Sequence, residues 1–348
     1  MKKQIQATVR RHPVTLVLAG IVFCGLLFSS RYSMYSQEQD PGAAAESSTP
    51  TRPPLGVSTV TQNPLQIALL HWYNANLTTQ FTTGTSPYGV AFDGANIWVC
   101  NNGSDNVTKV QANDGTILGT FAVGTSPLAV AYDGANVWVA NIHSNNVTKL
   151  NASTGATVGT FTVGTQPDAL AFDGSSIWVA NLVSNNVTKL KASTGATLGT
   201  FAVGVNPAGL VFDGTNIWVT NNGDGTVTKL SPAGAVLGTF TVGTYPTGIA
   251  FDGVNIWTAN YGSNNVSVLS LTGTLKGTFA AGSGPNGIAY DGANMWVTDF
   301  NGKAVTKLKA NTGATLGKVS VGLQPANVAF DGASIWVTNF GATTVSKL

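Results

Sequence analysis

The chain is poor in charge and lacks two charged residue types over most of its length. Only 9% of its 348 residues are charged, and from residue 70 onward there is neither arginine nor glutamate. This part holds 11 lysines and 12 aspartates, a net charge of −1. Because binding to phosphate backbones needs clustered basic side chains, the sequence predicts no nucleic-acid partner.

Cysteine and histidine are also scarce. The two cysteines are Cys24, inside an apolar segment, and Cys100, which we expect to be a small buried hydrophobe, so no disulfide is predicted. His143 is the one histidine after residue 71. Without glutamates or a carboxylate cluster beside it, we predict no catalytic set, no metal site and no cofactor.

An apolar run without charge, residues 14–28, lies near the N-terminus and follows four basic residues. This pattern predicts a basic cytoplasmic tail (1–12) and a signal-anchor or signal peptide (13–30). The anchor is favoured, because small residues suited to cleavage lie well downstream, at 43–45. The remainder is then expected in the periplasm or outside the cell, anchored to the membrane, or secreted if the segment is cleaved. A flexible linker (31–64) and a short lead-in (65–76), with a helix as one alternative, are predicted to follow.

One phrase recurs through the rest of the chain. An aromatic-Asp-Gly triplet, followed shortly by tryptophan, starts at Phe92, Tyr132, Phe172, Phe212, Phe251, Tyr290 and Phe330. Successive starts are 40, 40, 40, 39, 39 and 40 residues apart. A fixed period of this size is typical of a repeat architecture.

Each copy has the pattern of four short strands. In the second copy, apolar or alternating segments separated by turn residues predict strands at 128–132, 137–140, 146–150 and 156–163. Four antiparallel strands in about 40 residues form one propeller blade. The chain ends after the third strand of the seventh copy, at 344–348, whereas residues 77–84 match a fourth strand. We therefore predict an all-β, seven-bladed propeller over residues 77–348, closed by this N-terminal strand and preceded by one hydrophobic helix.

The repeat carries a family resemblance. Pro-x-Gly-Val-Ala-Phe-Asp-Gly-x-x-Ile-Trp-Val-x-Asn, followed by Asn-Asn-Val-Thr-Lys-Leu, resembles the YVTN-type β-propeller repeat, which is related to the NHL and streptogramin-lyase propellers. The resemblance covers residues 77–348. It implies the fold, but not one function, since the family includes binding proteins and a few enzymes.

Residues present in all seven copies are interpreted as structural. The aspartate of each Asp-Gly pair is expected to accept hydrogen bonds within its own turn, and the glycine to supply a positive φ. The repeated tryptophans are expected to pack between blades.

Residues that depart from their equivalents are the candidate binding residues. The links before each first strand and the loops after each second strand should share one face of the ring, and variation gathers there. The predicted binding residues are Tyr88, His143, Asp168, Tyr245, Tyr261, Asp299, Phe300 and Phe340. Neutral drift of unconstrained loops is the competing explanation.

Three hypotheses for function follow. The first is a monomeric, non-catalytic propeller that binds a small molecule, a glycan or a protein outside the cytoplasmic membrane. The second is a metal-dependent lyase or hydrolase. The streptogramin-lyase resemblance implies a histidine base and a carboxylate-held magnesium ion; the available residues are His143 and the two acids expected to line the pore, Asp168 and Asp299. The third is a purely structural surface protein.

Overall fold

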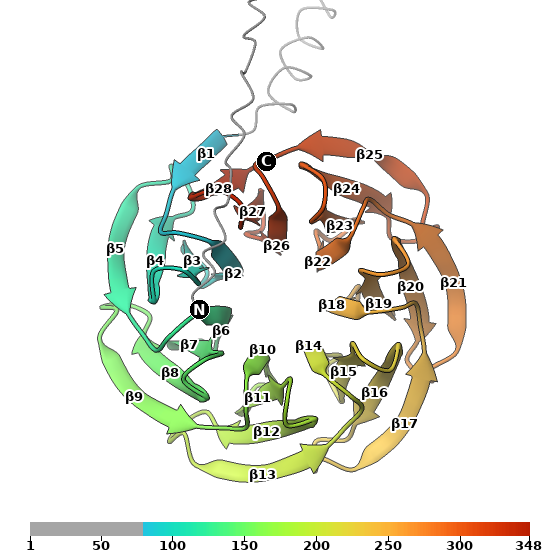
Figure 1. The fold of residues 1–348 in the computed structure, drawn as a ribbon, viewed down its shortest axis with the longest axis horizontal. Helices are drawn as coiled ribbons and strands as arrows, with labels where there is room; N and C mark the ends of the chain where they lie inside the picture. The colour runs from blue at the N-terminus through green and yellow to red at the C-terminus, as the bar shows by residue number, and fades with distance from the viewer. Residues whose placement is uncertain (1–78) are drawn as a thin grey trace, which may run out of the picture. The chain divides into compact units, whose positions relative to one another are not determined.

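A computed structural model describes residues 79–348, which form strands joined by turns. Within this range, 28 strands make seven four-stranded antiparallel sheets. Figure 1 shows them as blades around a central axis, each with its first strand innermost. The predicted seven-bladed all-β propeller is thereby confirmed. The N-terminal segments predicted at 1–12, 13–30, 31–64 and 65–76 lie outside the described residues. Within residues 79–348, no helix has the length and apolar character needed to span a membrane.

In each blade the strands follow each other from the inner edge, at the axis of the ring, to the outer edge. Blades 1 and 2 consist of β2 (Pro87–Phe92), β3 (Asn96–Asn101), β4 (Asn106–Gln111), β5 (Ile117–Ala122), and of β6 (Pro127–Tyr132), β7 (Asn136–Asn141), β8 (Asn146–Asn151), β9 (Thr157–Thr162). Blades 3 and 4 consist of β10 (Pro167–Phe172), β11 (Ser176–Asn181), β12 (Asn186–Lys191), β13 (Thr197–Ala202), and of β14 (Pro207–Phe212), β15 (Ile217–Asn221), β16 (Thr226–Leu230), β17 (Val236–Thr241). Blades 5 and 6 consist of β18 (Pro246–Phe251), β19 (Asn255–Asn260), β20 (Asn265–Ser270), β21 (Leu275–Ala280), and of β22 (Pro285–Tyr290), β23 (Asn294–Asp299), β24 (Ala304–Lys309), β25 (Thr315–Ser320). Blade 7 consists of β26 (Pro325–Phe330), β27 (Ile335–Asn339), β28 (Thr344–Lys347) and, as its outer strand, β1 (Thr79–Thr82).

The outer strand of blade 7 comes from the start of the described range. β1 pairs antiparallel with β28, with Phe81 opposite Val345. The Phe81 ring stacks on Trp336, with ring centroids 5.5 Å apart. In Figure 1, β1 lies outside β28. How much this strand contributes to the stability of the ring stays a prediction.

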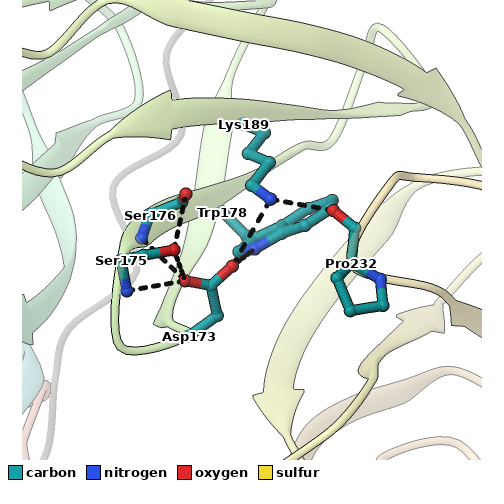
Figure 2. A network of polar contacts seen from close by, with 6 residues as sticks. All are labelled: Asp173, Ser175, Ser176, Trp178, Lys189 and Pro232. Atoms are coloured by element: carbon teal, nitrogen blue, oxygen red, sulfur yellow. Dashed lines mark hydrogen bonds and ion pairs between the residues drawn. The ribbon is translucent and has the colours of Figure 1, made fainter.

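The Asp-Gly turns are held by one recurring network, which Figure 2 shows for blade 3. One carboxylate oxygen of Asp173 accepts hydrogen bonds from the backbone N–H groups of Ser175 and Ser176, at 2.9 and 2.7 Å. The other accepts a 2.7 Å hydrogen bond from Nε1 of Trp178. Burial by itself would raise the pKa of the Asp173 carboxyl, but these hydrogen bonds outweigh it and hold the pKa below its ordinary value. Gly174, at φ 92°, adopts the left-handed conformation that the turn requires.

Each tryptophan lies at the interface with the following blade. Trp98 of blade 1, for example, clusters with Val137, Val139 and Leu150 of blade 2 and is fully buried. A lysine lies over the same ring: Lys109 Nζ is 5.2 Å from the centroid and donates a 2.7 Å hydrogen bond to the carbonyl of Ala152. The hydrophobic core is therefore divided among the blade interfaces, and the predicted packing role of the tryptophans is confirmed.

Candidate functional site

The inner strands line a central channel with a volume of about 190 Å³. Each inner strand begins with a proline that pairs with the last residue of the second strand, and a β-bulge follows it directly. A bulge redirects the local side chain. In six blades the residue after the proline therefore lines the channel, and these residues are Tyr88, Leu128, Asp168, Ala208, Thr247 and Asn286. In blade 7 the equivalent Ala326 is fully buried, and Asn327 lines the channel instead.

A second ring of channel residues lies two positions further along the same strands. Its members are all aliphatic: Val90, Val130, Leu170, Leu210, Ile249 and Ile288. Residues two apart in a strand point to the same side. Six blades therefore present one variable residue and one aliphatic residue to the channel, and in five of them the small residue between the two, alanine or glycine, also lines it. The variable residues of these six blades lie at the end of the channel where the links and loops lie.

The loops at this end are joined by backbone hydrogen bonds. The N–H of Tyr261 donates to the carbonyl of Tyr245 at 2.9 Å, and the N–H of Phe300 donates to the carbonyl of Gly284 at 3.0 Å. The loop after each of these second strands thus lies beside the link that precedes the first strand of its own blade. Both loop sets share one face of the ring, as expected from the sequence.

Asn286 connects three blades at the channel wall. Its Nδ2 group donates to the carbonyl of Ala326 in blade 7, at 2.9 Å, and to the hydroxyl of Tyr88 in blade 1, at 3.1 Å. Burial raises the pKa of the Tyr88 hydroxyl to about 12, and the nearby Asp168 carboxylate adds to the rise. Tyr88 therefore stays protonated and presents a neutral hydroxyl to the channel.

Asp168 is the one carboxylate among the residues that line the channel. Its side chain is only partly buried because it faces the channel lumen. The channel walls nevertheless surround it in place of bulk water, and this desolvation raises the pKa of the carboxyl to about 7. Within residues 79–348, the carboxylate accepts no hydrogen bond and forms no ion pair.

A wider cavity of about 350 Å³ lies at the channel mouth. It shares three residues with the channel: Tyr88, Thr247 and Asn286. Its remaining lining comes from blades 4, 5 and 6, and consists of Asn222, Tyr245, Tyr261 and Phe300. Tyr245 precedes an inner-strand proline with a left-handed φ of 50°, and its side chain is 57% exposed. The cavity and the channel together form a funnel with an aromatic rim.

Four rings contact one another in a chain along this rim. Tyr261 meets Phe300 edge to face with centroids 6.3 Å apart, Phe300 lies 6.0 Å from Phe340, and Phe340 meets Tyr88 edge to face at 5.8 Å. The Tyr261 hydroxyl donates to Oδ1 of Asn301 at 3.1 Å, which orients the ring. Six of the eight predicted residues, Tyr88, Asp168, Tyr245, Tyr261, Phe300 and Phe340, thus come together at the funnel.

The other two predicted residues lie elsewhere. His143 is exposed, and its Nδ1 is 2.9 Å from the hydroxyl of Ser126; it lines neither the channel nor the mouth cavity. Asp299 is only 2% exposed, lies inside blade 6, and accepts 3.0 Å hydrogen bonds from Thr306. It also pairs with Lys318 at 3.3 Å, while burial raises the pKa of its carboxyl. The expected position of Asp299 at the pore is therefore corrected. Asp299 is the last residue of β23. In the other blades this position holds an asparagine, whose side chain donates a hydrogen bond to a residue in the third strand of the same blade.

The sequence prediction missed three of the seven residues that line the mouth cavity, namely Asn222, Thr247 and Asn286. Thr247 and Asn286 occupy the same post-proline position as Tyr88 and Asp168, so the signal that identified those two also marks these. Asn222 was missed because blade 1 has an identical residue, Asn102, at the equivalent position, so Asn222 does not stand out as a departure from the repeat.

The magnesium site implied by the streptogramin-lyase resemblance does not fit these residues. Within residues 79–348, no three His, Cys, Asp or Glu side chains lie close enough together to hold a metal ion. Asp168 has no second carboxylate beside it in the channel lining, and Asp299 is engaged by Thr306 and Lys318. No catalytic step is therefore derived through a metal.

Comparisons with known proteins show similarity of fold. No protein-family model matches the sequence, and no curated protein matches it, so the YVTN-type assignment stays a prediction. Among solved structures, a streptogramin B lyase superposes with a TM-score of 0.69 at 17% identity, over 78% of this chain and 96% of that one. Virginiamycin B lyase from Staphylococcus aureus gives 0.68 at 18%, over 78% and 98% of the two chains. The hydrazine synthase of Kuenenia stuttgartiensis gives 0.69 at 18%, over 77% and 96%. The chain thus has a streptogramin-lyase-like β-propeller fold, as the repeats led us to expect.

Proposed function

We propose that the protein is a non-catalytic binding propeller whose ligand occupies the funnel at the channel mouth. The observation that carries the proposal is the convergence of residues that break the repeat. Five of the residues selected because they break the repeat, Tyr88, Asp168, Tyr245, Tyr261 and Phe300, line the channel or the mouth cavity, and Phe340 contacts Tyr88 and Phe300 beside them. Neutral drift has no reason to gather aromatic and acidic departures around a single concave site.

The fold similarity to streptogramin B lyases makes a lyase the second candidate. General acid–base catalysis needs a titratable side chain within reach of the reacting atoms. His143, the histidine that the resemblance implied as a base, lines neither part of the funnel. Asp168 is left without a catalytic partner of that kind, and binding accounts better for the residues present.

The proposal also includes location and assembly. The basic residues before the apolar run at 14–28 favour export, with the propeller outside the cytoplasmic membrane and the N-terminus inside. The shortage of basic charge argues against a nucleic-acid partner, and we infer that the propeller acts as a monomer. Protease added to intact spheroplasts should release the propeller, whereas a protected protein in the cytoplasmic fraction would contradict export.

The binding proposal is tested by screening the purified propeller against panels of glycans, peptides and small polar molecules, and by measuring hits by calorimetry. We expect the affinity for a ligand of the funnel to fall about tenfold or more in Tyr245→Ala and in Tyr261→Ala, because aromatic side chains contribute most of the binding energy at such sites. Val254→Ala is the control, since Val254 is 63% exposed in an Asp-Gly turn outside the funnel.

The competing hypotheses give different outcomes. A protein that binds nothing in the three panels would support the purely structural surface role. Turnover of a panel member that disappears with a chelator would support the lyase. A ligand whose affinity ignored both tyrosines and followed Val254→Ala would place the site on the opposite face.

A further inference from the structure

The part of the funnel formed by residues 79–348 combines one carboxylate with no cation. Among the described residues that line the channel and the mouth cavity, Asp168 is the sole acidic side chain, and there is no lysine, arginine or histidine. At a pH above 7 the lining therefore carries a net negative charge, concentrated at the narrow end of the funnel. An anionic ligand would meet unfavourable electrostatics there, and a cationic one favourable electrostatics.

Most third-strand lysines are engaged at the blade interfaces. Five of them lie over a tryptophan ring and donate to a carbonyl of the next blade; examples are Lys149 to Ala192 and Lys229 to Leu271, both at 2.7 Å. Lys318 pairs with Asp299 inside blade 6. These lysines therefore supply no counter-charge to the Asp168 carboxylate.

The rim adds a second feature, an aromatic surface above the carboxylate. Tyr88, Tyr245, Tyr261 and Phe300 line the mouth cavity, and the rings of Tyr261 and Phe300 are inclined to each other by 61°. Aromatic side chains of this kind bury the apolar part of a small ligand, while a polar group fixes its orientation. The channel carboxylate and the aromatic rim thus suit the two ends of one ligand, a cationic end and an apolar end.

We propose that the ligand is a compact organic amine, whose ammonium group enters the channel and donates hydrogen bonds to Asp168. Its apolar portion then remains at the mouth, against Tyr245, Tyr261 and Phe300. The aliphatic ring of Val90, Leu170 and their equivalents lines the channel beneath the ammonium group. This inference rests on the proposed binding function and specifies the chemical class of its ligand.

The pH dependence follows from the groups that face Asp168. The inner strands packed around it contribute Leu128, Ala208, Thr247, Asn286 and Asn327, which do not titrate, and Tyr88, which does. Because the pKa of the Tyr88 hydroxyl is raised, the charge of Asp168 alone changes near neutrality. An ammonium ligand should therefore bind more tightly at pH 8 than at pH 6, where the carboxyl is largely protonated.

The test uses a matched pair of probes, protonated 2-phenylethylamine and neutral 2-phenylethanol, titrated calorimetrically at constant ionic strength. We expect the amine to bind at least tenfold more tightly than the alcohol at pH 8, and the alcohol to show no change between pH 6 and 8. Asp168→Asn should abolish the advantage of the amine and its pH dependence. Asp114→Asn removes the same charge from an exposed turn, whose carboxylate accepts a hydrogen bond from Thr116, and should retain both.

Failure of this inference can be separated from failure of the proposed function. Equal affinity for the two probes, or an amine affinity unchanged by Asp168→Asn, would overturn the assignment of an amine. If a neutral panel ligand then still required Tyr261, the proposed binding function would stand. If neither probe and no panel ligand bound in a manner that depended on Tyr261, both would be wrong.

Discussion

The hydroxyl of Tyr88 accepts a hydrogen bond from Nδ2 of Asn286 at 3.1 Å, although the two residues lie 198 positions apart. Tyr88 belongs to blade 1 and Asn286 to blade 6, and the same amide also bonds to Ala326 in blade 7. Polar contact across the channel wall therefore spans the place where the first and last blades meet. Side chains that form part of the candidate site also join the two ends of the ring.

This relationship predicts that two substitutions, at Asn286 and at Tyr88, lower the free energy of unfolding by different amounts. Asn286→Ala removes two hydrogen bonds and should lower the free energy of unfolding by about 1–2 kcal/mol, since the Ala326 carbonyl keeps only the hydrogen bond that it accepts from Thr298. Tyr88→Phe should cost less, about 0.5–1 kcal/mol, because the Asn286 amide keeps its bond to Ala326. Urea unfolding midpoints provide the comparison, and equal losses would contradict the central role of Asn286.

The Asp-Gly turns should be important for stability and irrelevant to binding. Asp173→Ala would leave the buried Trp178 Nε1 and the turn N–H groups without their acceptor, and should cost about 2–3 kcal/mol. Ligand affinity at the funnel should stay unchanged. Asp114→Ala, in an exposed turn, serves as the control and should leave the thermal midpoint near that of the parent. If Asp173→Ala weakened ligand binding and left stability unchanged, the binding site would lie on the Asp-Gly face of the ring and not at the funnel.

Removal of β1 should destabilise the ring. Deletion of residues 1–76 keeps the pairing of β1 with β28 and should leave a soluble domain with cooperative unfolding. Deletion of residues 1–84 removes the outer strand of blade 7 and the Phe81–Trp336 contact, and should lower the melting temperature sharply. Equal melting temperatures for the two truncations would show that this strand does not secure closure.

Asp168 should make the stability of the protein depend on pH. Its pKa is about 7 in the folded protein and close to the ordinary 3.8 in the unfolded chain. Between these values the folded state binds more protons, so the contribution of Asp168 to stability falls as the pH rises from about 4 to 7, and levels off above.

Asp168→Asn removes this effect and permits a clean measurement. The variant should gain stability relative to the parent as the pH increases from 5 to 8, by an amount on the order of 2–4 kcal/mol. Subtracting the two unfolding curves at each pH cancels the titration of all other groups. A difference that does not vary with pH would mean that the channel carboxylate is fully hydrated.

The local pattern of the sequence was sufficient for the blades. The period near 40 residues and the turn residues predicted strands at 128–132 and 137–140, and β6 and β7 lie there within one residue at either end. Such predictions succeed because the alternation of side chains and the chemistry of turns act over a few residues. The Asp173–Trp178 hydrogen bond escaped prediction, since the pairing of two side chains in a hairpin depends on the register of the folded strands.

The binding candidates were only partly determined by the sequence. Comparison of the copies singled out Tyr88, Asp168 and Tyr261 because a repeat makes each departure visible. It placed Asp299 at the pore wrongly, since the last residue of a second strand points into its own blade, toward Thr306. Which departures share a cavity depends on how seven blades close around an axis and on the bulge after each proline. The repeat by itself therefore determined the architecture. Only the closed ring decided that one carboxylate and an aromatic rim lie near the same channel, because these residues come from different blades and no pattern within a blade brings them together.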